Sequence, residues 1–170
     1  LDRRERACWD AGRKRDPRFR AALRIDPLLL DWPATWRKVG ELGTTVGEET
    51  TPATLGEIQR FLVEWARRID ALYMAVSLPP DYTVPADTPR AVILEGAVLP
   101  ACRELGLPLA MMVGVKRGVA PALADAGDGV GRADLDWVAH LCRAYPHNGF
   151  MLTVLARENQ HEAVVLARKF

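Results

Sequence analysis

The chain has 170 residues, 49% of them hydrophobic and 26% charged, with a formal net charge of +1 at pH 7. This length and balance predict a single globular domain and exclude a disordered or membrane-spanning protein. No apolar run approaches the roughly 20 residues of a membrane-spanning helix, and no apolar region follows the basic start, as it would in a secretory signal. The first residue is not Met, and the last residues continue a helical pattern, so we expect the natural chain to be longer.

Residues 1–20 carry an excess of positive charge, with eight Arg or Lys against four acidic residues. Such a run is typical of a basic arm for nucleic acid or anionic lipid, or of the solvated face of a helix. The second is the commoner case, so we expect a basic helical segment here, with no nucleic acid and no membrane as partner. Residues 21–170 are then successive βα units of the same domain.

From residue 21 onward, short apolar runs alternate with amphipathic helical patterns. The runs AALRI, ALYMAVS, LPLAMMVGV and NGFMLTVLA are too short for helices and predict buried strands. Within the helical patterns, Pro100 predicts a kink or break, Gly106 a C-terminal cap, and Asp134 an acidic first turn. Apolar residues at helical spacing predict four helices, over 54–70, 87–106, 132–146 and 157–170.

Strands that recur about every 40 residues, each followed by a helix, predict right-handed crossovers and a parallel sheet. Two architectures fit this pattern, an open doubly wound sheet and part of a (β/α)₈ barrel. A full barrel needs about 250 residues, so this chain could form only part of one. In both, functional side chains gather at the carboxyl ends of the strands. This rule selects four clusters: Arg24 with Asp26, residues 77–81, Lys116 with Arg117, and residues 157–159.

Three arginines, Arg24, Arg117 and Arg157, each follow a predicted parallel strand. A guanidinium group pairs in bidentate fashion with carboxylates and phosphates. Three such groups at one rim would suit a small anionic substrate. The alternative is that one or two of them form salt bridges with acidic residues of the loops.

The glycine-rich stretch AGDGVG, residues 126–131, suggests a loop around a phosphate, since backbone amides before a helix bind anions. Its spacing is G-x-G-x-G rather than G-x-G-x-x-G, and about ten residues separate it from the preceding strand. It matches neither a P-loop nor an EF-hand loop. A structural turn is favoured, and a non-catalytic anion- or nucleotide-binding α/β module stays open as an alternative.

The cysteines and histidines lack the spacing of a disulfide framework or a metal site. Three cysteines, far apart and without a C-x-x-C pair, are typical of reduced thiols in a cytoplasmic protein. His161 and Glu162 begin like the zinc motif H-E-x-x-H, but residue 165 is Val. The sequence therefore predicts no metal-binding residue in this chain.

Three stretches resemble one known family. They are ALYMAVSLPPDYTVP, LPACRELGLPLAMMVGVKR, and the run from AGDGVGRAD to the end of the chain, in which LARENQHE is most distinctive. Together they are similar to the middle of a uronate isomerase, of the glucuronate/galacturonate isomerase family in the amidohydrolase superfamily. The resemblance covers about Leu72 to Phe170. Upstream, LRIDPLL resembles the family's F-R-P-D strand end, while residues 1–20 and 32–52 do not align.

The resemblance implies a partial (β/α)₈ barrel of about four parallel strands. It also implies an intramolecular oxidoreductase that interconverts a hexuronate with its keto isomer, as in glucuronate to fructuronate. Members of the family use a divalent metal, commonly zinc, held by an H-x-H on the first strand and an Asp at the last. This chain contains no H-x-H, and Met111-Met112 stand where many relatives have a His.

The resemblance implies five substrate-binding residues in this chain and leaves the catalytic residues unassigned. We therefore expect strand ends that bind a small hexuronate, without the metal centre and without activity in the isolated chain. We also expect exposed sheet edges that favour self-pairing into a homo-oligomer. The five substrate-binding residues are Arg24, Arg117, Asp128, Arg157 and Asn159.

Overall fold

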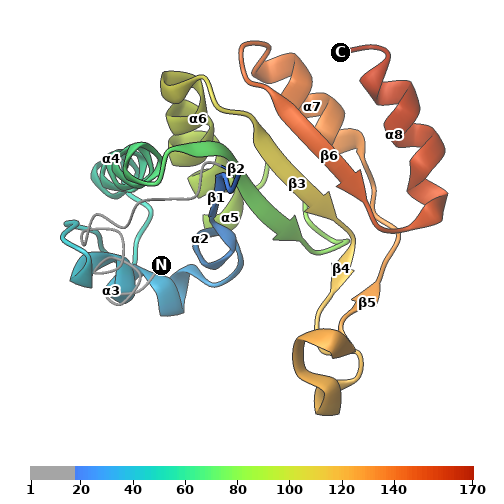
Figure 1. Ribbon diagram of the computed structural model, residues 1–170, viewed down its shortest axis with the longest axis horizontal. Coiled ribbons are helices and arrows are strands. Elements are labelled where there is room, and N and C mark those ends of the chain that lie inside the picture. Colours follow the sequence, from blue (N-terminus) through green and yellow to red (C-terminus); the bar gives the residue numbers. More distant parts are fainter. Residues whose placement is uncertain (1–17) are drawn as a thin grey trace.

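Four parallel strands form the main sheet of the computed structural model, which describes residues 18–170 (Figure 1). The strand order is β1-β2-β3-β6, so each strand lies beside the one that precedes it in this set. The predicted parallel sheet is thereby confirmed, while the predicted basic helical segment lies, up to residue 17, outside the described residues. The four strands are β1 (Ala21–Arg24), β2 (Ala71–Leu78), β3 (Leu109–Val113) and β6 (Phe150–Val154).

Helices connect the strands, and two of them, α2 and α3, were not predicted from the sequence. No described helix is long and apolar enough to cross a membrane. Short 3₁₀ segments also occur at Pro121–Gly127 and Arg157–Asn159. The α-helices are α2 (Asp26–Leu30), α3 (Trp32–Glu41), α4 (Pro52–Arg68), α5 (Pro89–Ile93), α6 (Leu99–Leu105), α7 (Asp136–Ala144) and α8 (Gln160–Ala167).

Helix α4 illustrates how local sequence specifies these crossovers. It begins after Thr51, whose hydroxyl accepts a hydrogen bond from the Thr54 amide at 3.2 Å, satisfying one of the free donors of the first turn. Ile58, Leu62 and Trp65 recur at helical spacing and are almost fully buried. Burying such an apolar stripe supplies most of the stability of a helix on a sheet.

The predicted irregularity at Pro100 appears as a π-helical turn, Leu94–Val98, between α5 and α6. The Leu99 amide donates to the Leu94 carbonyl, five residues back, so the chain accommodates Pro100 just after the wide turn. Gly96, in the same turn, lies against α4, where an added Cβ would come within 2.7 Å of Leu55 Cδ1. Gly106 ends α6 in the left-handed conformation, as predicted.

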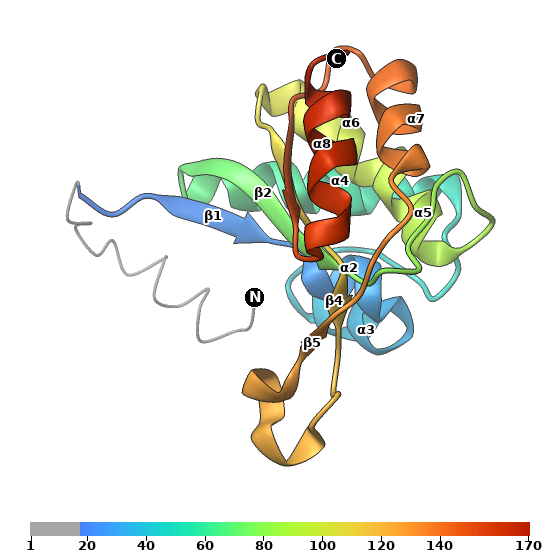
Figure 2. The ribbon, with the colours of Figure 1, turned by 90° about the vertical axis from the view of Figure 1, so that its right-hand side faces the viewer.

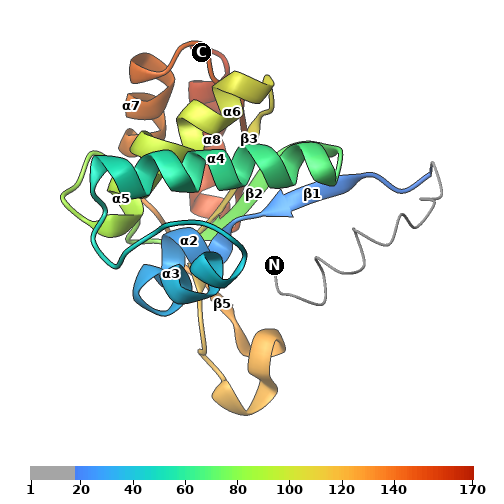
Figure 3. The same ribbon diagram turned by 90° about the vertical axis from the view of Figure 1, so that its left-hand side faces the viewer.

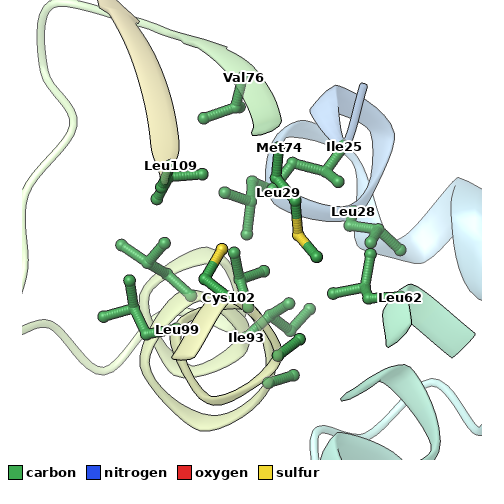
Figure 4. Close-up of a cluster of buried hydrophobic side chains, with 14 of the residues drawn as sticks. Ile25, Leu28, Leu29, Leu62, Met74, Val76, Ile93, Leu99, Cys102 and Leu109 are labelled. Atoms are coloured by element: carbon green, nitrogen blue, oxygen red, sulfur yellow. The ribbon is translucent and has the colours of Figure 1, made fainter. Parts of the chain in front are cut away.

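The helices pack on one face of the sheet, and this arrangement decides between the two architectures. Figure 4 shows Met74 and Leu109 of the strands meeting Cys102 of α6 and Leu62 of α4 in the core. A doubly wound sheet has helices on both faces, whereas a barrel has them only on its outside. The fold is therefore a partial (β/α)₈-type barrel, as predicted.

The opposite face of the sheet, which we call the open face, lines a shallow cavity of about 270 Å³. Alternation of side chains along each strand separates this face from the core. Met112 and Met151, two long apolar side chains on it, are 40% and 49% exposed. The residues whose side chains alternate onto the open face are Ala22, Arg24, Tyr73, Ala75, Ser77, Ala110, Met112, Met151 and Thr153.

A hairpin arm stands away from the body of the domain (Figures 2 and 3). Its two strands, β4 (Val115–Lys116) and β5 (Gly129–Val130), pair antiparallel. The sequence predicted a loop here, except for Val115, which ended the predicted strand LPLAMMVGV. It also predicted that the following helix begins near residue 132, whereas α7 begins at Asp136. Asp134 precedes that helix, and its carboxylate accepts a hydrogen bond from the Asp136 amide at 2.9 Å.

Candidate functional site

The carboxyl ends of the four parallel strands lie at one edge of the sheet, which we call the rim. Arg24 is the last residue of β1, and Ser77 lies one residue before the end of β2. Arg117 follows β4 on the arm, while Arg157 begins the 3₁₀ segment that follows β6. The strand ends predicted to carry function therefore lie at the same edge, although Arg117 stands on the arm.

Arg24, Asp26 and Ser77 form a network at the rim. Arg24 donates from Nε and Nη2 to the two oxygens of Asp26, at 2.7 and 2.8 Å, and from Nη2 to Ser77 Oγ at 3.2 Å. The Ser77 amide donates to Asp26 Oδ1 at 2.9 Å, although the two residues are 51 positions apart. The network fixes the guanidinium while leaving 60% of the Arg24 side chain exposed.

The protonation of this pair follows from its surroundings. Burial opposes the charge of Asp26, but the hydrogen bonds from Arg24 and from the Ser77 amide outweigh it, so the pKa of Asp26 lies below its ordinary value. The hydrogen bond to Asp26 in turn raises the pKa of Arg24, despite partial burial. Both groups are therefore charged at neutral pH, and the pair as a whole is close to neutral.

Arg117 and Asp128 form the second pair, on the arm. Arg117 Nη1 donates to Asp128 Oδ2 at 2.6 Å, and the Gly118 amide donates to Asp128 Oδ1 at 2.9 Å. The hydrogen bond from Gly118, joined by that from Arg117, lowers the pKa of Asp128. Two of the three arginines thus form salt bridges with acidic residues, Arg24 with the first residue of α2 and Arg117 with Asp128 of the loop before β5, close to the alternative that the sequence left open.

Arg157 and Asn159 lie close together in the chain but differ in environment. Arg157 is exposed and makes no ion pair with a described residue. Asn159 is only 2% exposed, and its amide group donates to the Ala133 carbonyl at 2.6 Å and accepts from the Ala133 amide at 2.9 Å. Asn159 therefore connects the rim to the loop before α7, a contact that the sequence did not reveal.

The AGDGVG stretch forms the return side of the arm. Gly129 pairs with Lys116 across the hairpin, and the Gly131 amide donates to the Gly114 carbonyl at 2.8 Å. Gly127 and Gly131 each lie where an added Cβ would come too close to a neighbour. At Gly127 it would overlap the Ala120 carbonyl oxygen, and at Gly131 it would lie 2.8 Å from Pro80 Cγ. Close packing thus accounts for these two glycines, in agreement with the structural turn favoured by the sequence.

A group of three carboxylates, Asp134, Asp136 and Glu162, was not predicted. One oxygen of each lies within 4.8 Å of the others, a donor set of the kind that hard cations accept. It does not match the histidine and aspartate ligands that the family resemblance implies for zinc, and the sequence has no H-x-H. The residues of this chain therefore do not fit the family's metal.

Comparisons with known proteins show which family this chain is similar to. No family model and no curated protein matches the sequence. Among solved structures, a uronate isomerase from Bacillus halodurans is 48% identical, with a TM-score of 0.95, over 100% of this chain and 40% of that one. A uronate isomerase from Thermotoga maritima has a TM-score of 0.69 and 14% identity over 86% of this chain and 40% of that one, a likeness of fold alone. The resemblance to the uronate isomerase family is thus confirmed, and the similarity to the first of these structures extends upstream of Leu72, where residues 1–20 and 32–52 were not expected to align. The chain spans about 40% of the length of these relatives.

Proposed function

We propose that this chain serves in the isomerisation of a hexuronate, an aldose–ketose interconversion of the glucuronate-to-fructuronate type. The observation that carries the proposal is the 48% identity with a uronate isomerase along the entire chain. In such a reaction one proton moves from C2 to C1 of the open-chain sugar and a second moves from the C2 hydroxyl to the C1 oxygen, while the carboxylate stays unchanged. The carboxylate is therefore a group of constant charge and structure, to which the protein can bind in order to orient the substrate.

The rim supplies arginine side chains that can bind the substrate carboxylate. Arg157 is exposed and without an ion pair to a described residue, so its guanidinium can accept a carboxylate in bidentate fashion. Arg24 is held in place by Asp26 and Ser77, and it still exposes 60% of its side chain. We assign Arg24, Arg117 and Arg157 to substrate binding, Asp128 to orienting Arg117, and Asn159 to positioning the segment that carries Arg157.

Metal chemistry is not assigned to these residues. The resemblance implies a divalent ion, zinc above all, whose histidine ligands have no counterpart in this sequence. The Asp134, Asp136 and Glu162 group offers oxygen donors only. What this chain supplies is binding and orientation, and we expect no turnover of D-glucuronate by the chain alone, with or without added zinc.

Calorimetric titration with D-glucuronate tests the binding role, with D-glucose as the sugar that lacks a carboxylate. We expect glucuronate to bind and glucose not to bind. Replacing Arg157 with Gln should weaken glucuronate binding about tenfold, the effect of losing one charge-assisted pair. Arg143→Gln, at the exposed end of α7 beside the start of β6, is the matched control. Equal affinity for both sugars, or an unchanged affinity in Arg157→Gln, would contradict this assignment.

A further inference from the structure

The hydroxyl of Ser77 accepts a hydrogen bond but donates none to a described residue. Its oxygen accepts from Arg24 Nη2 at 3.2 Å, whereas the hydrogen bond from Ser77 to Asp26 comes from the backbone amide. A serine hydroxyl also carries one hydrogen, which rotates to meet an acceptor. Ser77 is 7% exposed, and a buried donor without an acceptor costs free energy. A ligand oxygen that accepts this hydrogen would remove that cost.

Arg24 has an unused donor as well. Its Nε and Nη2 donate to the two oxygens of Asp26, and Nη2 also donates to Ser77, whereas Nη1 donates to no residue in the described part of the chain. A guanidinium group carries N–H donors on each of its nitrogens. The side chain of Arg24 is 60% exposed. Nη1 is therefore the nitrogen of Arg24 that remains for a ligand.

The two side chains line one cavity. Arg24 ends β1, Ser77 lies in the neighbouring strand β2, and both border the cavity of about 270 Å³ on the open face. Asp26 accepts from Arg24 and from the Ser77 amide, so it fixes the two strand ends relative to each other. Donors that are already held in position lose little conformational freedom when a ligand binds.

The charge of the network makes a second donor important. Asp26 carries a negative charge beside Arg24, so the pair is close to neutral and attracts an anion less strongly than an unpaired arginine would. The binding of a carboxylate at this point therefore depends on directed hydrogen bonds. Hydrogen bonds to an ionised acceptor are stronger than those between neutral groups, so a neutral hydroxyl donor contributes to such a site.

We propose that Ser77 is a further substrate-binding residue, which donates its hydroxyl hydrogen to the carboxylate that Arg24 binds through Nη1. One donor comes from β1 and the other from β2, and together they hold a single carboxylate group. This role rests on the proposed function, because the carboxylate is that of a hexuronate. Ser77 is not among the residues that the family resemblance implies for substrate binding.

NMR titration of the chain with D-glucuronate measures the affinity, including weak binding. Ser77→Ala removes the hydroxyl but keeps the backbone amide that donates to Asp26. We expect this variant to bind D-glucuronate about tenfold more weakly, the effect of one hydrogen bond to a charged group. Ser77→Thr keeps a hydroxyl and should restore most of the affinity. Thr45→Ala, which removes an exposed hydroxyl from the loop between α3 and α4, is the matched control and should bind as the parent does.

A second readout separates direct binding by Ser77 from positioning of Arg24. The two hydrogen bonds from Arg24 to Asp26 are shorter than its bond to Ser77, so Ser77→Ala should leave Arg24 in place. The hydrogen on Arg24 Nε, which Asp26 accepts, should exchange with solvent at the same rate in the parent and in Ser77→Ala, as followed by NMR. Faster exchange at Nε together with weaker binding would overturn the proposal, because Ser77 would then act only through Arg24.

The titrations also distinguish failure of this role from failure of the proposed function. If the parent binds D-glucuronate and Ser77→Ala binds it equally well, Ser77 does not contact the carboxylate, and the binding role of the chain still stands. If the parent does not bind D-glucuronate, the proposed binding role is wrong and the role of Ser77 is wrong with it.

Discussion

Arg24 and Asp26 meet through two hydrogen bonds of 2.7 and 2.8 Å at the carboxyl end of β1. The aspartate is the more buried partner, with 16% of its side chain exposed against 60% for the arginine. Asp26 also accepts the Ser77 amide, so it joins the end of β1 to the end of β2. This carboxylate therefore acts as a positioning residue that presents Arg24 at the rim.

Replacing Asp26 with Asn should lower the free energy of unfolding by about 1 kcal/mol at pH 7, because the side chain keeps its shape but loses its charge. The folded-state pKa of Asp26 is depressed, so its contribution is fully present above the ordinary value of 3.8 and is lost as pH falls through the folded-state pKa. Urea unfolding from pH 7 to pH 3 measures the free energy of unfolding of the parent protein and of Asp26→Asn. The difference between the two free energies should become smaller below about pH 4. Asp81→Asn, in an exposed loop, is the control and should change the free energy of unfolding at pH 7 by less than about 0.5 kcal/mol.

Asn159→Ala should cost about 2 to 3 kcal/mol, because it leaves both backbone groups of Ala133 without a partner in a buried site. The exposed neighbour Gln160→Ala is the control and should change the free energy of unfolding by less than about 0.5 kcal/mol. Urea denaturation of both variants provides the comparison. Equal losses would show that the Asn159 contacts contribute nothing specific.

The positions of the main strands could be predicted from the sequence, whereas the hydrogen-bond network at the rim could be predicted only in part. The runs that became β2 and β3 are short and almost entirely apolar, the composition that is typical of strands in a parallel sheet. Helix α3 was missed although Trp32, Thr35 and Val39, all buried, follow a helical stripe and Asp31 caps it. The signal for this helix was therefore present in the sequence.

Other features could not be read from the chain. Strands β4 and β5 have two residues each, too few for any periodic pattern. The Asp26–Ser77 hydrogen bond joins residues 51 positions apart, and only the pairing of β1 with β2 brings them together. The strand-end rule did place Arg24 and Arg157 at one edge, because it depends on strand polarity, which the βα alternation reveals.

The two described cysteines should differ in reactivity toward iodoacetamide at pH 8. Burial raises the pKa of Cys102 to about 12, and this side chain is 1% exposed. Cys142 is partly exposed, and although burial raises its pKa too, the charge of Arg143 opposes the shift. Since the thiolate is the nucleophile, peptide mass spectrometry should find Cys142 modified well before Cys102. In urea the two rates should become equal; equal rates in the folded protein would contradict this packing.

Gly127→Ala should loosen the arm without unfolding the domain. An added Cβ would overlap the Ala120 carbonyl oxygen, a backbone atom that cannot move aside alone. The Ala120 amide donates to the Gly127 carbonyl at 2.9 Å, so this overlap would disturb the hydrogen bond that joins the two sides of the arm. Overpacking of this kind costs about 1 to 3 kcal/mol. Hydrogen exchange at the Ala120 amide should therefore accelerate about tenfold or more, while amides of β2 and β3 stay protected.

Gly47→Ala is the matched control for this substitution, because nothing lies within 4 Å of its added Cβ. It should leave exchange on the arm unchanged. A phosphate-binding role for AGDGVG makes a different prediction, since Gly127→Ala would then weaken binding of inorganic phosphate while exchange at Ala120 stayed the same. If Gly127→Ala accelerates exchange at Ala120 and the parent protein binds no phosphate, Gly127 serves the close packing of the hairpin. The contact between Gly127 and Ala120 favours this role.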